Sequence, residues 1–153
     1  MSNSQRVREN LLLKGLGQPL ALNAIDWKIK QQNPWAGPSE VQNDTLEAVR
    51  SLVDEGLFRL GDVHARHFFT WRRPLDRSMR KISQQYVDHY DRPGRWMYSA
   101  WLNLTDKGEK LALAIEEQGI DAFRDHGVAE VTQLRAGVAA PQLRRDIANR
   151  SVA

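Results

Sequence analysis

The sequence predicts a small α+β domain that is mostly helical. Apolar residues recur at helical spacing over residues 40–55 and 74–90. Short strand-like runs, residues 57–63 and 95–104, follow these two segments. The chain has 153 residues, of which 41% are hydrophobic and 27% charged. This length and this composition are those of one globular domain.

Two helices are predicted nearer the N-terminus. The first covers residues 5–14 and ends at a stretch that contains two glycines and a proline. The second covers residues 20–32, because Leu22 and Ile25 lie on one helical face. Residues 33–38, with the sequence NPWAGP, are expected to form a loop.

Residues 40–55 are predicted to form one continuous helix. Ser39 and Gln42 match a capping box, in which the two side chains satisfy early backbone N–H groups of the helix. A second capping pair, Asp44 with Glu47, would permit a break inside the segment. We prefer the continuous helix, because the break would leave a preceding helix of barely one turn.

A sharp change of structure is expected after this helix. Gly56 suits the C′ position that follows a helix, and residues 57–63 then form a short strand. Residues 64–73 form a second strand or an ordered loop. Residues 74–90 form an amphipathic helix, and residues 91–94 form a turn before the next strand.

A last helix is predicted to begin near Asp106, which pairs with Glu109 in a second capping box. We divide the chain into a domain over residues 1–119 and a C-terminal helix or partly ordered tail over residues 120–153. Periodicity predicts that the core includes Val49, Leu52, Val53, Leu57, Leu75, Met79, Ile82, Leu104, Leu111 and Ile115.

Two motifs resemble the winged-helix domains of bacterial regulators. They are TLEAVRSLVDEGLFRLG, within residues 45–63, and LNLTDKGEKLA, within residues 101–115. The same layout resembles that of small actinobacterial proteins of uncharacterised function. The resemblance implies a helix before the glycine, a β-wing, and a helix that opens with LTxKG. The predicted fold is therefore winged-helix-like α+β, with a small antiparallel sheet and an inserted helix.

Charge is distributed unevenly along the chain. Residues 34–58 carry one basic and five acidic residues, whereas residues 59–105 carry nine basic and four acidic residues. The helix that the resemblance implies as the recognition helix is thus acidic, and carboxylates are repelled by DNA phosphates. If nucleic acid binds, the candidate contacts lie in the basic segment. They are Arg72, Arg73, Arg77, Arg80 and Lys81.

No pattern in the sequence predicts catalysis, a metal or another cofactor. The chain has no cysteine, so disulfides and cysteine-based zinc sites are excluded, in agreement with a cytoplasmic location. His64 and His67 lack the spacing that places two zinc ligands on one helix face. We expect no enzyme, no metal site and no membrane association.

The five tryptophans point to an interaction surface. Tryptophan is enriched at the energetic centres of protein interfaces. Trp71, Trp96 and Trp101 are the candidate partner contacts, and at least one of the five tryptophans is expected to be partly exposed.

The leading interpretation is a non-catalytic macromolecular interaction module. Its partner would be another protein or a second copy of the chain, and an immunity-like or antitoxin-like role falls within this class. The alternative is a winged-helix transcriptional regulator that binds DNA through its basic segment.

Overall fold

The computed structural model describes residues 2–126, with side chains as far as Gly119. Contacts divide the chain into a unit Met1–Ile115 and a second unit that begins at Glu116. In the second unit, the described residues 116–126 continue the last helix. Most of the segment 120–153 predicted as a C-terminal helix or tail lies outside the described residues.

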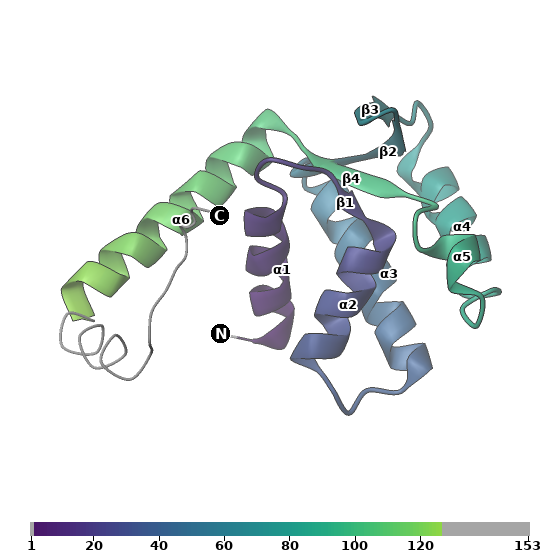
Figure 1. Ribbon diagram of the computed structural model, residues 1–153, viewed down its shortest axis with the longest axis horizontal. Coiled ribbons are helices and arrows are strands. Elements are labelled where there is room, and N and C mark those ends of the chain that lie inside the picture. The colour runs from purple at the N-terminus through teal and green to yellow at the C-terminus, as the bar shows by residue number, and fades with distance from the viewer. Residues whose placement is uncertain (1, 127–153) are drawn as a thin grey trace. The chain divides into compact units, whose positions relative to one another are not determined.

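The described residues form six helices and four strands, so the chain is α+β and mostly helical, as predicted. In order they are α1 (Asn3–Lys14), β1 (Leu20–Ala21), α2 (Leu22–Gln32), α3 (Pro38–Asp54), β2 (Phe58–His64), β3 (His67–Thr70), α4 (Leu75–Tyr86), α5 (Pro93–Trp96), β4 (Trp101–Leu104) and α6 (Asp106–His126). In Figure 1, α1, α2 and α3 lie on the same side of the sheet.

The third helix is continuous, as predicted, but it begins differently. Gly37 is its N-cap and Pro38 occupies its first turn, and no side chain caps it. The expected capping box at Ser39 is therefore wrong. Proline has no backbone N–H that needs a partner, and its φ is already helical, so the helix starts without a capping side chain.

The predicted strand over residues 95–104 is only partly correct. Residues 93–96 form the short helix α5, and the strand β4 is limited to residues 101–104. Pro93 occupies the first turn of α5. The indole N–H of Trp96 donates a hydrogen bond to the carbonyl of Tyr90, and its ring is buried. Aromatic content therefore reflected burial here rather than strand structure.

The sheet is antiparallel with the order β1–β4–β2–β3. Phe58 and Leu60 of β2 lie opposite Leu104 and Leu102 of β4, and this face carries the core. Residues that alternate with them point to the opposite face. Among these, Gly61 has no room for a side chain, because a Cβ there would overlap the carbonyl of Phe69.

The two motifs with a family resemblance meet in space. Gly56 has a φ of +74°, and the amide of Leu57 bonds to the carbonyl of Leu52, so α3 ends in a Schellman motif. The hydroxyl of Thr105 donates to the Gly56 carbonyl and accepts from the amide of Gly108. Thr105 is therefore the N-cap of α6, which corrects the predicted capping pair of Asp106 and Glu109.

The core is larger than the sequence indicated. Five of the ten predicted core residues are buried: Val49, Leu52, Leu57, Met79 and Ile82. The other five pack against the core while partly exposed: Val53, Leu75, Leu104, Leu111 and Ile115. The same core also includes residues that were not in the predicted set, among them Val7, Leu11, Leu12, Phe58, Tyr86 and Leu102.

A buried carboxylate joins α2 to α4 and to the segment that follows α4. Asp26 is only 2% exposed. Its carboxylate accepts hydrogen bonds from the hydroxyls of Tyr86, at 2.6 Å, and Tyr90, at 3.0 Å. The ammonium group of Lys30 lies 2.9 Å from its other oxygen. With these partners the buried carboxylate is fully hydrogen-bonded. Without it, the buried tyrosine hydroxyls would have no acceptor.

Two pKa shifts are consistent with this arrangement. Burial, together with the hydrogen bond to Asp26, raises the pKa of Tyr86. Burial lowers the pKa of Lys30, but its hydrogen bonds to Asp26 and Tyr90 outweigh that effect and raise it overall. The tyrosine therefore stays protonated and the lysine stays charged at neutral pH.

We predict that Asp26→Ala lowers the free energy of unfolding by about 3–5 kcal/mol, because it leaves the Tyr86 hydroxyl buried without an acceptor. Urea denaturation monitored by circular dichroism measures this. The control is Asp88→Ala, which removes an exposed carboxylate and should change stability by less than about 0.5 kcal/mol. Equal stability of the two variants would contradict the assignment.

Candidate interaction surface

The strands β2 and β3 form a hairpin with a two-residue turn. Ala65 and Arg66 occupy the turn with φ values of +50° and +69°. Positive φ at both positions is typical of a type I′ turn, which matches the twist of a hairpin but usually contains Asn or Gly. The turn lacks those residues, which is why the sequence left residues 64–73 open between a strand and a loop.

One edge of this hairpin is free. The strand β3 is last in the sheet order, and within residues 2–126 no other strand pairs with its outer side. The amide of Trp71 bonds to the carbonyl of Leu60, so the alternate residues Phe69 and His67 also face β2. The backbone groups of Phe68 and Thr70 therefore point outward. These two residues thus present two N–H donors and two C=O acceptors, with which a further strand can pair.

The free edge also carries exposed apolar surface. The side chain of Phe69 is 55% exposed, and that of Phe68 is partly exposed on the opposite face of the strand. A segment that paired with this edge would cover aromatic surface on both faces. Backbone pairing and side-chain burial would thus act together, as in other complexes formed by strand addition.

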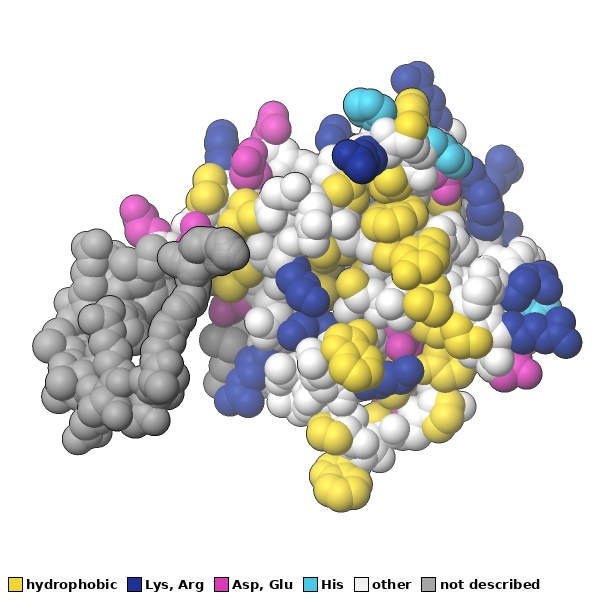
Figure 2. Space-filling model, viewed as in Figure 1, with side chains coloured by type: hydrophobic (Ala, Val, Ile, Leu, Met, Phe, Trp, Pro, Cys, Tyr) yellow, Lys and Arg dark blue, Asp and Glu magenta, His cyan; other side chains and the backbone are white. Residues whose placement is uncertain are grey.

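Basic residues surround the hairpin and the start of α4. Residues 59–81 contain seven basic and two acidic residues. Figure 2 shows Lys, Arg and His side chains gathered over this region. Both acidic residues have partners, because Asp62 accepts the indole N–H of Trp71 and Asp76 pairs with Arg50. The surface therefore keeps a net positive charge.

The predicted nucleic-acid contacts are part of this basic surface. Arg72, Arg77, Arg80 and Lys81 are exposed, and Arg73 is half-buried. Arg73 and Lys81 lie over the ring of Trp71, with their charged groups 4.6 Å and 4.8 Å from its centroid. These two cations stabilise the base of the hairpin and are held near the ring.

The structure buries two of the three tryptophans that were predicted as partner contacts. Trp71 and Trp96 are buried, the latter only 3% exposed, and Trp101 is half-buried with its ring stacked on Tyr98. The expectation of partly exposed tryptophans is confirmed by others, Trp27 and Trp35. Trp96 is buried because it packs on the rings of Tyr86 and Tyr90, at 4.8 Å and 5.3 Å between centroids.

The outer face of α3 is acidic, as the sequence indicated. Glu40, Asp44 and Glu47 are exposed on this helix. Partial burial, together with the negative charges of Glu40 and Glu47, raises the pKa of Asp44. Arg50 of α3 forms an exposed ion pair with Asp76 of the neighbouring helix α4, at 2.8 Å. This face is a poor surface for a phosphate backbone.

The two histidines lie at the end of the hairpin. His64 and His67 are directly opposite each other on β2 and β3, and both are exposed. In the part of the chain that the structure describes, no group of three or more His, Cys, Asp or Glu side chains is arranged to hold a metal ion. Over the same residues, no helix combines the length and the apolar character needed to cross a membrane.

No known protein family, curated protein or solved structure matches this chain.

Sequence reasoning located the basic surface and missed the free edge. The edge follows from the strand order, which places β3 last in the sheet. A usable signal was present in HARHFFT, residues 64–70, where two residues separate a pair of histidines and two aromatic residues follow. Without Asn or Gly in the turn, that signal was too weak to identify a hairpin.

We predict that Glu47→Gln lowers the pKa of Asp44, because it removes one neighbouring negative charge. A carboxyl group whose pKa is higher in the folded than in the unfolded state favours folding at pH values below its unfolded-state pKa. This contribution to stability is lost as the pH rises through the folded-state pKa. Glu47→Gln should therefore stabilise the protein at pH 7 more than at pH 3. NMR titration of the carboxyl groups and urea denaturation at both pH values measure these effects.

The matched control is Glu9→Gln, which makes the same chemical change on α1. A similar gain in stability from both variants at pH 7 would show that net charge, and not the crowding around Asp44, is responsible.

Proposed function

We propose that the chain is a non-catalytic interaction module on a winged-helix-like scaffold, and that it binds an acidic, extended segment of a partner protein along β3. The observation that carries this proposal is the free edge of β3 with its outward-facing Phe68 and Thr70 backbone groups. The exposed ring of Phe69 and the surrounding basic residues support it.

The order of the helices and strands supports the proposal of a winged-helix-like scaffold. The chain begins with the helix α1 and the short strand β1. The helices α2 and α3, joined by residues 33–37, come next, and the hairpin of β2 and β3 follows them. The strand β4 then leads through LTDKG, residues 104–108, into a helix. The resemblance implies a helix before the glycine, a β-wing and a helix that opens with LTxKG. The helix α3, the strands β2 and β4, and the helix α6 follow one another in this way and support the proposed scaffold, with β3, α4 and α5 between β2 and β4.

The charge around β3 favours an acidic partner over a second copy of the chain. In the antiparallel register that pairs Phe68 with Thr70 of a copy, Arg66 would lie opposite Arg72. Like charges opposite each other are destabilising in a sheet. A strand that carries glutamate or aspartate would instead meet these arginines with complementary charge.

A polypeptide partner also fits the edge better than a nucleic acid does. The four outward-facing backbone groups are spaced for another polypeptide strand. The carboxylates of Glu40, Asp44 and Glu47 would repel a duplex that followed α3. The proposed partner therefore approaches the hairpin, and α3 takes no part in binding.

We predict that a fluorescent eight-residue peptide alternating glutamate and valine binds the full chain, as measured by anisotropy, and that its lysine–valine counterpart does not. Thr70→Pro should weaken binding at least tenfold, or about 1.4 kcal/mol. Proline deletes the outward N–H of Thr70 and leaves the bonds between β2 and β3 in place.

The matched control is Thr70→Ala, which keeps the N–H and should bind as the wild type does. Circular dichroism should show the same fold for both variants. Equal binding of the glutamate and lysine peptides, or equal binding by the two Thr70 variants, would remove the support for strand addition.

A second function, DNA binding by a regulator, is favoured by the exposed cations of α4. The matching test is a labelled 20-base-pair duplex titrated at 50 mM and 150 mM salt. Under the proposed function, any duplex binding should be lost at the higher salt, because only a few phosphate contacts are available.

Binding that persists at 150 mM salt would assign the regulator function instead. It should then be abolished by reversing Arg77, Arg80 and Lys81 to glutamate, and Thr70→Pro should leave it unchanged.

A further inference from the structure

Trp35 is the most exposed large hydrophobic side chain among the described residues, at 94%. It lies in the connection between α2 and α3, residues 33–37. A single exposed apolar residue is common on protein surfaces, so exposure alone does not identify a role. A tryptophan is nevertheless the residue most suited to fill a pocket on another molecule.

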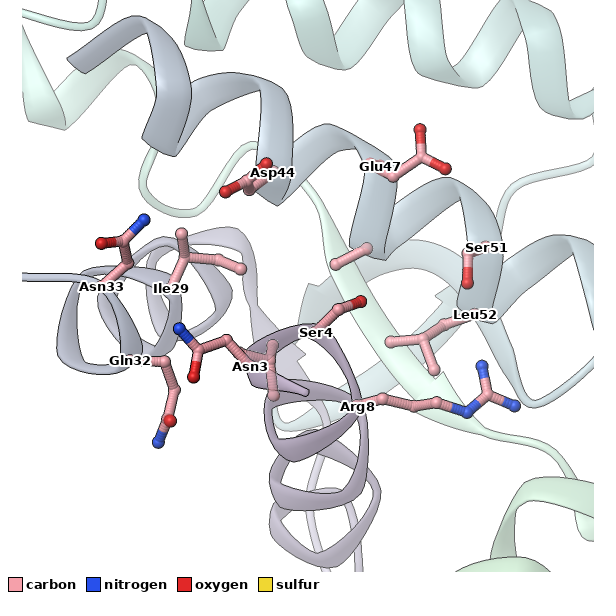
Figure 3. A pocket seen from close by; sticks show the side chains of 12 residues that line it. Asn3, Ser4, Arg8, Ile29, Gln32, Asn33, Asp44, Glu47, Ser51 and Leu52 are labelled. Carbon is pink, nitrogen blue, oxygen red and sulfur yellow. The ribbon is translucent and has the colours of Figure 1, made fainter. Parts of the chain in front are cut away.

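A cavity of about 270 Å³ lies close to this connection, between α1, α2 and α3 (Figure 3). In that view, Ser4, Ile29 and Leu52 project from three different helices toward the same space. Apolar lining comes from Val7, Ile29, Ala48 and Leu52. Polar lining includes Gln32, Asn33 and Asp44.

The size of the cavity suits one aromatic side chain. An apolar cavity of about 150 Å³ is known to hold benzene, so 270 Å³ accommodates an indole ring. Pockets for drug-sized ligands are larger, about 300–1,000 Å³. The polar rim suits the indole N–H, because the carboxylate of Asp44, which lines the cavity, can accept a hydrogen bond from it.

We propose that the chain forms a two-fold symmetric dimer in which Trp35 of each copy inserts into the cavity of the other. The placement of the two features supports this arrangement. Gln32 and Asn33 line the cavity, and Trp35 follows them within three residues. A patch that carries both the inserted ring and the receiving cavity is self-complementary, as a two-fold interface requires.

The buried area sets the expected strength of this dimer. A tryptophan buries about 150–250 Å², so two rings supply about 300–500 Å². Stable interfaces bury about 1,200–2,000 Å² in total, so the rims of the cavities must also make contact. Interfaces at the lower end of this range are weak, and the dimer should therefore form in a concentration-dependent way.

This dimer would leave the proposed protein-binding edge accessible. Within the first unit, the connection between α2 and α3 and the hairpin of β2 and β3 lie at opposite ends (Figure 1). The two proposals are therefore independent, and each is tested by its own substitutions.

Sedimentation equilibrium of the full chain between about 5 and 500 µM tests the dimer, a range suited to a weak interface. Trp35→Ala removes both inserted rings of the dimer and should weaken association about 1,000-fold, because each hot-spot tryptophan contributes at least about 2 kcal/mol. Ala48→Leu should weaken it similarly by filling the cavity from within. Trp27→Ala removes a tryptophan of α2 that is 56% exposed and does not line the cavity, so this variant should associate as the wild type does.

Three results would overturn the proposal. They are a wild-type chain that stays monomeric at every concentration, a Trp35→Ala variant that associates as the wild type does, and equal weakening by Trp27→Ala. If Trp35→Ala is monomeric while a folded Ala48→Leu variant still associates, Trp35 docks elsewhere and the assignment to the cavity is wrong. Urea denaturation establishes that Ala48→Leu is folded.

Discussion

The buried carboxylate of Asp26 fixes the arrangement on which the surfaces of this protein depend. It lies on α2 and accepts the hydroxyls of Tyr86, at the end of α4, and Tyr90, just beyond it. A buried carboxylate needs partners, and these hydroxyls supply them only when α4 lies against α2 and α3. The aromatic packing of Tyr86, Tyr90 and Trp96 then forms around the same point.

This constraint decides which surfaces are open. With α4 in place, one flank of α3 is occupied, and Arg50 pairs with Asp76 across the two helices. The remaining face of α3 is acidic. The chain that leads into α4 also positions the hairpin, because Arg73 and Lys81 lie over the Trp71 ring while its indole N–H bonds to Asp62. Thus α3 is closed to a phosphate backbone, and the edge of β3 is left open.

The sequence predicted the helices better than it predicted the surfaces. The helices α1 to α4 were expected within a few residues of their observed ends, because their apolar spacing reports the face that each one buries. The two motifs of the resemblance were identified in the sequence, and the bonds among Thr105, Gly56 and Gly108 show that they meet in space. The basic residues of the candidate site were also found, since charge is visible without a fold.

The remaining features depend on contacts between distant residues. The sequence predicted Trp96 as a strand residue and as a partner contact. The side chain is instead buried against the rings of Tyr86 and Tyr90, which lie beside it only in the folded chain. No pattern in the sequence distinguishes Asp26 from other polar residues on helices, although the structure buries it. The free edge of β3 required the order of the strands, which no local pattern contains.

The central claim is that an acidic partner segment adds to the edge of β3 and itself makes no contact with α3. Backbone amide exchange of the full chain, with and without a saturating acidic strand peptide, measures this directly. The amides of Phe68 and Thr70 point outward, so they should exchange rapidly in the free protein and slow on binding. Amides on the acidic face of α3, around Asp44 and Glu47, should be unchanged. Slower exchange on α3 with no change at Phe68 and Thr70 would contradict the claim.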